Sequence, residues 1–263
     1  MKHLILAMAV LFAFVSLAFA EGGVKKRKPL PYEFGSVVIG NFSGSAGLSP
    51  VVFDHWIHRS KYTCRVCHVD IGFGMSAGST KIRAADNGKG FYCGTCHNGK
   101  SKYENKIIFE ACSGKDSHKC GICHSMGRNP LREQAFAKFA ENLPKERLGN
   151  GINWQLAEEK GLISPINYLE GISIKRNAMS VQKDFSLEAK NEGMPSIIFS
   201  HSKHTVWNGC ELCHPDIFLG VKKGATKYSM IDLFQGKYCG VCHNKVAFPQ
   251  TDCQRCHVGS VEK

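Results

Sequence analysis

The segment Val52-Phe53-Asp54-His55-Trp56-Ile57-His58 and the run Cys64-Arg65-Val66-Cys67-His68 that follows it decide the organisation of this 263-residue chain. The second part, Cys-x-x-Cys-His, is the pattern to which a c-type haem is covalently attached. The two thiols add to the two vinyl groups of one porphyrin, and the adjacent histidine becomes the proximal ligand of the iron. The chain contains six such runs, formed by Cys64, Cys67 and His68; Cys93, Cys96 and His97; Cys120, Cys123 and His124; Cys210, Cys213 and His214; Cys239, Cys242 and His243; and Cys253, Cys256 and His257. We therefore expect six covalently attached haem c groups.

Two other uses of these cysteines fit the sequence less well. A zinc protein pairs one Cys-x-x-Cys with a second pair or with two spaced histidines, and it has no reason to place histidine after every second cysteine. Six disulfides in a secreted scaffold would also use twelve cysteines, but they would not require the histidines either. The haem interpretation accounts for both residue types.

An internal repeat divides the six motifs into two sets of three. The upstream segment recurs as Ile198-Phe199-Ser200-His201-Ser202-Lys203-His204, and in both copies the histidines lie nine and six residues before the first motif. Cys64 to Cys93 and Cys210 to Cys239 are both 29 residues apart, so a constant offset of 146 relates the halves. The register changes only before the third motif, where the first half has thirteen additional residues that include Cys112 and His118. We expect Cys112 to be a buried, unreactive thiol.

The repeated Phe-x-His-x-x-His pair followed by three haem motifs resembles the triheme cytochrome c7 family and its multidomain relatives, which are kin to cytochrome c3. The resemblance covers both haem units and leaves the region between them outside. It implies a mainly α and irregular fold with two c7/c3-like triheme units of sparse secondary structure. We expect short helices, short strands at 51–53 and 197–199, and a helical connector, because units this small must use the porphyrins as part of their apolar interior.

The resemblance also implies distal ligands. By position, His55 would complete the haem of His68, and His58 that of His97. In the second half His201 would serve the haem of His214, and His204 that of His243.

Methionine is the implied distal ligand at the third haem of the second unit. Some multidomain members of the family supply it from a Tyr-[Ser/Thr]-Met segment, which Tyr228-Ser229-Met230 matches, so Met230 is the candidate for the haem of His257. In the first half Ala84 occupies the matching place. The candidates for the haem of His124 are then Met75, His118, Met126 and Cys112, of which we favour Met75.

The remaining sequence supplies the segment boundaries. A short basic start, an apolar run at 4–17 and Ala18-Phe19-Ala20 form a cleavable export signal, and no later run is long enough to span a membrane. Pro130 can open one helix that ends near Pro144, and 153–160 indicates a second. We expect a signal peptide at 1–20, a basic N-terminal tail at 21–47, the first triheme unit at 48–127, a connector at 128–195 that packs the units together, the second unit at 196–258 and a tail at 259–263.

Charge and location limit the partners. The formal net charge is +12, but each haem brings two propionates against one ferric charge, so six haems would cancel about half of it. The lysines do not alternate with base-stacking aromatics, and we expect no nucleic-acid binding. Haem attachment outside the cytoplasm and the export signal agree on a periplasmic or secreted protein that is not integral to the membrane.

The sequence predicts an electron carrier rather than an enzyme. We expect its partners to be donor and acceptor cytochromes or membrane quinol-oxidising complexes, and the family resemblance implies a setting of anaerobic respiration. Two alternatives stay open: a multihaem reductase with an open coordination position at the haem of His124, and a subunit of a larger cytochrome assembly. The sequence does not fix the oligomeric state.

Overall fold

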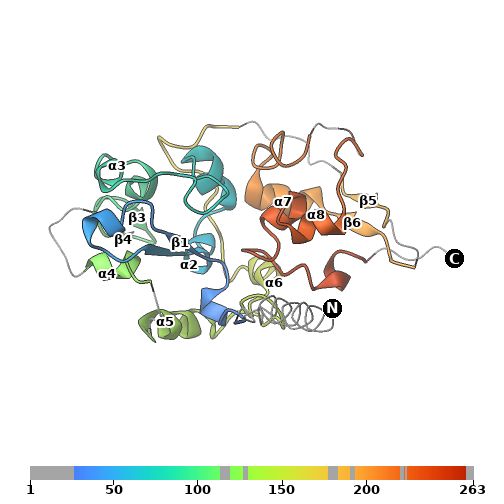
Figure 1. The fold of residues 1–263 in the computed structure, drawn as a ribbon, viewed down its shortest axis with the longest axis horizontal. Helices are drawn as coiled ribbons and strands as arrows, with labels where there is room; N and C mark the ends of the chain where they lie inside the picture. The colour runs from blue at the N-terminus through green and yellow to red at the C-terminus, as the bar shows by residue number, and fades with distance from the viewer. Residues whose placement is uncertain are drawn as a thin grey trace, which may run out of the picture.

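Short elements separated by irregular chain make up the computed structural model, which describes residues 27–112, 119–126, 130–176, 183–189, 193–219, 222 and 224–258. The helices are α2 (His55–Arg59), α3 (Ala84–Gly88), α4 (Cys120–Cys123), α5 (Pro130–Ala140), α6 (Trp154–Glu159), α7 (His201–Asn208) and α8 (Met230–Phe234). The strands are β1 (Ser36–Ile39), β2 (Val51–Asp54), β3 (Lys102–Tyr103), β4 (Lys106–Ile107), β5 (Phe185–Leu187) and β6 (Ile197–Phe199). This sparse, mainly helical and irregular fold is the predicted one (Figure 1). In these parts of the chain no helix is long and apolar enough to cross a membrane.

Each haem unit begins with a two-stranded antiparallel hairpin. In the first unit β1 pairs with β2, with Val37 opposite Phe53, and in the second β5 pairs with β6, with Phe185 opposite Phe199. The strands at 51–53 and 197–199 were predicted, but their partners were not. The expectation that 21–47 is only a tail is wrong beyond residue 30, because β1 is paired and the side chain of Tyr32 is buried in the core. Both units therefore extend upstream of the repeat that the cysteines define.

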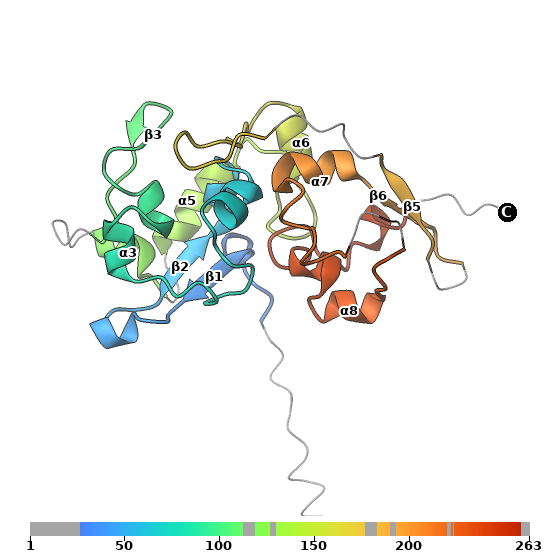
Figure 2. The ribbon, with the colours of Figure 1, turned by 90° about the horizontal axis from the view of Figure 1, so that it is seen from above.

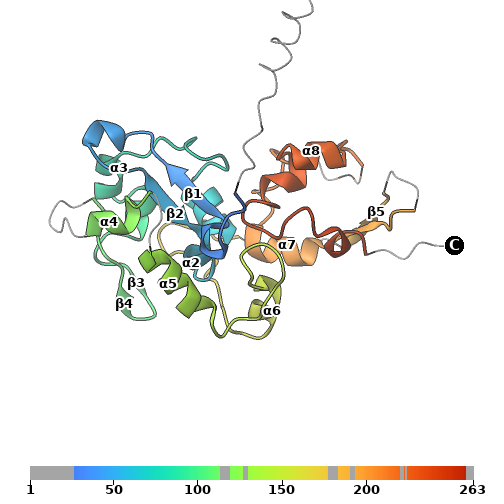
Figure 3. The same cartoon turned by 60° about the horizontal axis from the view of Figure 1, so that its bottom comes forward.

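The connector is packed and not a flexible linker: together with Tyr32 and Trp56 of the first unit it forms the main apolar core. Trp56 of α2 packs edge-to-face on Phe136 of α5, with ring centroids 5.2 Å apart. Both predicted connector helices are present, and the side chain of Asn153 caps α6 by accepting a hydrogen bond from the Leu156 amide at 3.0 Å. The buried cluster comprises Tyr32, Trp56, Phe136, Ala140, Leu143, Ile152, Ala157 and Ile163. Figure 3 shows α5 beside the first unit and α6 beside α7 of the second.

A buried carboxylate of the first unit holds the connector segment 171–176. The Asp70 side chain is fully buried. It accepts a hydrogen bond from the Ser173 hydroxyl at 2.7 Å and forms an ion pair with Arg176 at 3.1 Å. Arg176 also pairs with Glu211 of the second unit. Although 171–176 has no helical or strand period, these contacts hold it against both units (Figure 2).

The thirteen additional residues of the first unit are partly accounted for. Seven of them separate His97 from Phe109 and build the β3–β4 hairpin, since the equivalent histidine of the second unit, His243, is followed closely by Phe248. Cys112 follows this hairpin and is exposed, so the expectation of a buried thiol is wrong. His118 lies outside the described residues.

Candidate haem-binding sites

All ten histidines assigned to haem iron orient one ring nitrogen in the same way. Each Nδ1 lies within hydrogen-bond distance of a backbone carbonyl oxygen. For the six motif histidines the acceptors are Phe73 for His68, Phe109 for His97, Ser49 for His124, Phe218 for His214, Phe248 for His243 and Pro195 for His257, at 2.6 to 3.2 Å. For the upstream histidines they are Gly35 for His55, Asp54 for His58, Lys183 for His201 and Ser200 for His204, at 2.6 to 3.3 Å.

This pattern sets the tautomer of every ring. A carbonyl oxygen can only accept, so each Nδ1 carries the proton and each Nε2 keeps a free lone pair. Metal-ligating histidines normally have such a partner on the second nitrogen. Burial lowers the pKa of His55, His58 and His243 to about 4, despite the opposing effect of the carbonyl bonds. These imidazoles are therefore neutral at pH 7, as ligation requires.

Three upstream histidines face the motif histidines that the sequence assigned to them. The ring centroids are 6.3 Å apart for His55 and His68, and the rings are nearly parallel at 7°. The separation is 6.3 Å for His58 and His97 and 6.4 Å for His204 and His243. Two imidazoles that each bind one metal ion through a nitrogen at about 2.0 Å from opposite sides have centroids about 6 Å apart. The spacing therefore suits one iron between each pair.

The fourth predicted pair is not brought together in this way. Among the described residues no ring contact links His201 with His214. His201 nevertheless has surroundings like those of His55. Its Nδ1 lies 3.3 Å from the Lys183 carbonyl oxygen, as that of His55 lies near the Gly35 carbonyl oxygen, and both acceptors lie one or two residues before the first strand of a hairpin.

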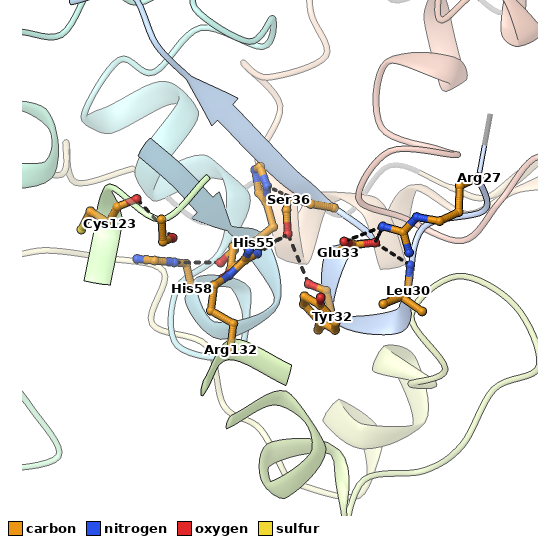
Figure 4. Close-up of polar contacts among 12 residues, drawn as sticks. Arg27, Leu30, Tyr32, Glu33, Ser36, His55, His58, Cys123 and Arg132 are labelled. Carbon is orange, nitrogen blue, oxygen red and sulfur yellow. Dashed lines mark hydrogen bonds and ion pairs between the residues drawn. The ribbon is translucent and has the colours of Figure 1, made fainter. Parts of the chain in front are cut away.

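The phenylalanine of the Phe-x-His-x-x-His segment positions both histidines. Phe53 contacts His55 edge-on at 4.9 Å and stacks on His58 at 4.2 Å. Phe199 contacts His201 edge-on at 4.9 Å and stacks on His204 at 4.5 Å. The two units thus use one packing arrangement. Figure 4 shows His55 and His58 of the first unit beside the hairpin, to which Arg132 is also bonded through Ser36 and Asp54. The phenylalanine was part of the recognised motif, but its role became clear only from these contacts.

A large cavity connects the imidazoles with the attachment cysteines. Its volume of 1790 Å³ exceeds the roughly 300–1,000 Å³ of pockets for one small ligand. The lining includes His55, His58, His68 and His97, and the attachment residues Cys64, Cys67, Cys93, Cys96 and Cys123. No two of the thirteen cysteines, all of which lie in the described residues, form a disulfide with one another. The volume and the donor set together fit several haem groups that share walls.

The histidine of the third motif bonds to an equivalent backbone carbonyl in each unit. The His124 Nδ1 donates to the Ser49 carbonyl and the His257 Nδ1 to the Pro195 carbonyl, and the two acceptors differ by the repeat offset of 146. Met75 lines the large cavity together with Cys123 of the third motif. Met230 begins α8 and is 38% exposed.

The second motif of each unit requires glycine after its first cysteine. A Cβ atom on Gly94 would lie 2.8 Å from the Asn87 Cα and closer still to the Asn87 carbonyl oxygen. A Cβ atom on Gly240 would lie 3.0 Å from the Leu233 carbonyl carbon and closer to its oxygen. Backbone atoms of α3 and α8 therefore lie in close contact with the second motif of the first and of the second unit, respectively.

Comparison with solved structures gives relatives that are also multihaem cytochromes. A c7-type three-heme cytochrome domain is 37% identical over 31% of this chain and 99% of its own, with a TM-score of 0.27. The C-terminal hexaheme fragment of GSU1996 is 27% identical over 88% of this chain and 99% of its own, with a TM-score of 0.26. The dodecaheme cytochrome c GSU1996 is 25% identical over 86% of this chain and 75% of its own, with a TM-score of 0.28.

No curated protein matches the chain. The sequence model of the family described as cytochrome c7 and related cytochrome c matches residues 51–125 and 197–258, which together are just over half of the chain. These two matches coincide with the two sets of three motifs. The protein is therefore a multihaem c-type cytochrome and belongs to the family of cytochrome c7 and related cytochromes c.

Proposed function

We propose that the protein is an exported hexahaem cytochrome that relays electrons between redox partners and is not itself an enzyme. The observation that carries this proposal is the facing of imidazole pairs across iron-sized gaps, seen for His55 with His68 and for His204 with His243. An iron with two protein ligands has no position left for a substrate. Electron transfer is the reaction that such a closed site supports.

The same pairing of imidazoles across an iron-sized gap assigns the distal ligands. We assign His55 to the haem of His68, His58 to that of His97, His201 to that of His214 and His204 to that of His243. Three of these assignments are supported by the ring separations. The His201 assignment is supported by its Phe199 contact and its carbonyl partner, which repeat those of His55.

Methionine completes the assignments at the two third haems. Met230 would serve the haem of His257, and Met75 that of His124. The position of Met75 in the wall that also contains Cys123 supports the second assignment. A histidine–methionine pair raises the reduction potential relative to two histidines, so each unit would combine two low-potential haems with a higher one.

The chain contributes ligands, orientation and exclusion of water. Bound haem supplies an iron that changes between the ferric and ferrous states. The Nε2 atoms offer lone pairs, the backbone carbonyls hold each ring in place, and Phe53 and Phe199 prevent the paired rings from rotating. Because these groups are preset in the fold, few of them need to move when an electron arrives.

Cytochromes of this family typically work outside the cytoplasm, and the apolar run at 4–17 followed by Ala18-Phe19-Ala20 supports export of this chain. A periplasmic or secreted carrier would exchange electrons with other cytochromes or with membrane quinol-oxidising complexes. The formal positive charge favours acidic partners.

Two measurements test the proposal. Intact mass of the protein from an export-competent host should give a mature chain beginning near Glu21 with six haem groups. Carbon monoxide added to the dithionite-reduced protein should leave the spectrum unchanged. Fewer haems would contradict the cofactor count, and stoichiometric binding of carbon monoxide to one haem would identify an open iron and favour the reductase alternative.

A further inference from the structure

Arg59 links the first haem unit to the second. It is the last residue of α2, directly after His58, and its Nη1 donates a hydrogen bond of 2.7 Å to the carbonyl of Val246, three residues beyond His243. Its guanidinium carbon lies 4.3 Å from the ring centre of Trp154 in the connector and 5.2 Å from that of Trp207 in α7. One side chain thus contacts both units and the connector.

The charge of Arg59 has no paired carboxylate in the described parts of the chain. Its Nε is buried and has no hydrogen-bond partner. Glu158 lies within electrostatic range, but its carboxylate accepts a hydrogen bond from the Trp207 indole at 2.6 Å and forms no ion pair with Arg59. A guanidinium stays protonated in proteins, and burying an uncompensated charge is costly. The two tryptophan rings offset part of this cost through cation–π contacts.

Two attachment cysteines, one from each unit, line the same cavity as Arg59. The Arg59 guanidinium lies within electrostatic range of the sulfur atoms of Cys64 and Cys242. Cys242 is in turn within range of Cys64 and of Cys213. Cys242, Val246 and Leu212 of the second unit also line the cavity that holds His68. The attachment sites of the two units therefore meet at Arg59.

We infer that Arg59 is a positioning residue of the junction, which holds a fixed positive charge beside the haem of Cys64 and Cys67 and the haem of Cys239 and Cys242. The inference rests on the proposed function, because it requires haem at both sites. A nearby positive charge stabilises the ferrous state relative to the ferric state, which carries one more positive charge. Arg59 therefore raises the potentials of these two haems together and makes them the place where electrons cross between the units.

The test compares the haem potentials of Arg59→Gln with those of the unaltered protein. A redox titration followed by NMR resolves the haems individually, and the axial-ligand resonances of His68 and His243 identify the two junction haems. Both midpoint potentials should fall in Arg59→Gln, whereas the other haems should shift less. In Arg59→Lys the two junction potentials should stay close to those of the unaltered protein, because lysine keeps the positive charge.

Arg83→Gln is the matched control. Arg83 also lies over an aromatic ring, that of Phe42 at 4.1 Å, but it is exposed on the first unit. Its removal changes the net charge equally and should leave the two junction potentials unchanged. Glu158→Gln adds a perturbation of opposite sign, because it removes a negative charge near Arg59 while a side-chain oxygen remains for Trp207. It should raise the same two potentials, and it supplies the test if Arg59→Gln fails to accumulate.

Unchanged junction potentials in Arg59→Gln, a uniform shift of all haems, or an equal shift in Arg83→Gln would overturn the inference. A fall confined to one unit would also overturn it, since the charge would then not be shared. Intact mass separates this result from failure of the proposed function. Fewer than six haems in the unaltered protein contradicts that function, whereas six haems with potentials insensitive to Arg59 contradict only the role of Arg59.

Discussion

The close approach of α3 to the second haem motif gives a sharp prediction for Gly94→Ala. The new methyl group would lie 2.8 Å from the Asn87 Cα and closer to the Asn87 carbonyl oxygen, which is far inside van der Waals contact. The obstacle is backbone at the end of a helix and cannot rotate away as a side chain could. Either α3 must shift away from the motif or the segment that carries Cys93 and Cys96 must move.

The expected loss of stability lies at the upper end of the range for overpacking, about 3 kcal/mol, because backbone must move. A chain of this size loses about 2–4 °C in Tm for each kcal/mol, so Tm should fall by about 6–12 °C. Displacement of Cys93 and Cys96 also moves His97 away from His58, whose rings are 6.3 Å apart. We therefore expect one haem with altered axial ligation or incomplete attachment.

Thermal unfolding followed by circular dichroism, with intact mass for haem content, measures both effects. Gly121→Ala is the control, because Gly121 occupies the same place in the third motif and a Cβ atom there would meet nothing within 4 Å. That residue lies in α4, where alanine is favoured over glycine by roughly 0.5–1 kcal/mol. Its Tm should be unchanged or slightly higher, with full haem content. Equal Tm values and equal haem content in the two variants would refute the reasoning.

Three other changes have directions fixed by the structure. Asp54→Asn removes the carboxylate that pairs with Arg132, and since both side chains are only 12% exposed we expect a loss of up to about 3 kcal/mol in unfolding free energy, measured by guanidinium denaturation. Trp56→Ala removes a core side chain that is 4% exposed and should cost about 3–5 kcal/mol in the same assay; a smaller loss than 1 kcal/mol would mean that the connector is not packed as described. Met230→His should lower one midpoint potential without changing haem content, and an unaltered potentiometric titration would count against Met230 as a ligand.

The sequence alone was sufficient for features that repeat or that have strict spacing. The Cys-x-x-Cys-His runs and the Phe-x-His-x-x-His segments define the repeat, and its offset relates His58 to His204 and His97 to His243. The pairing of His58 with His97 and of His204 with His243 came from the family resemblance, and the structure brings the rings of each pair together. The strands at 51–53 and 197–199 and the helix capped by Asn153 were also predictable, because β-branched and aromatic runs and capping residues are local signals.

Contacts between distant segments were not predictable in this way. Strand β1 contains the β-branched residues Val37, Val38 and Ile39, but they lie outside the repeat, and the pairing with β2 that makes this segment part of the first unit is not a local signal. Arg59 looks like any surface arginine after a histidine until the structure places Trp154, Trp207 and Val246 around it. Cys112 is exposed and follows the hairpin at 102–107, whose inserted residues have no counterpart in the second unit from which its surroundings could be inferred.

The choice of carbonyl partners for the histidines bears on how the haems differ from one another. A carboxylate on Nδ1 would make an imidazole more electron-donating and would add a negative charge near the iron. The ten partners here are neutral, from Gly35 in the first unit to Pro195 in the second, so the orienting bonds alone leave the bis-histidine sites electrically similar. Methionine ligation, the burial of each haem and fixed charges nearby are then the features that can make the potentials differ. Asp54 is neutralised by Arg132, whereas Arg59 has no paired carboxylate in the described part of the chain, which makes Arg59 the charge best placed to distinguish the junction haems.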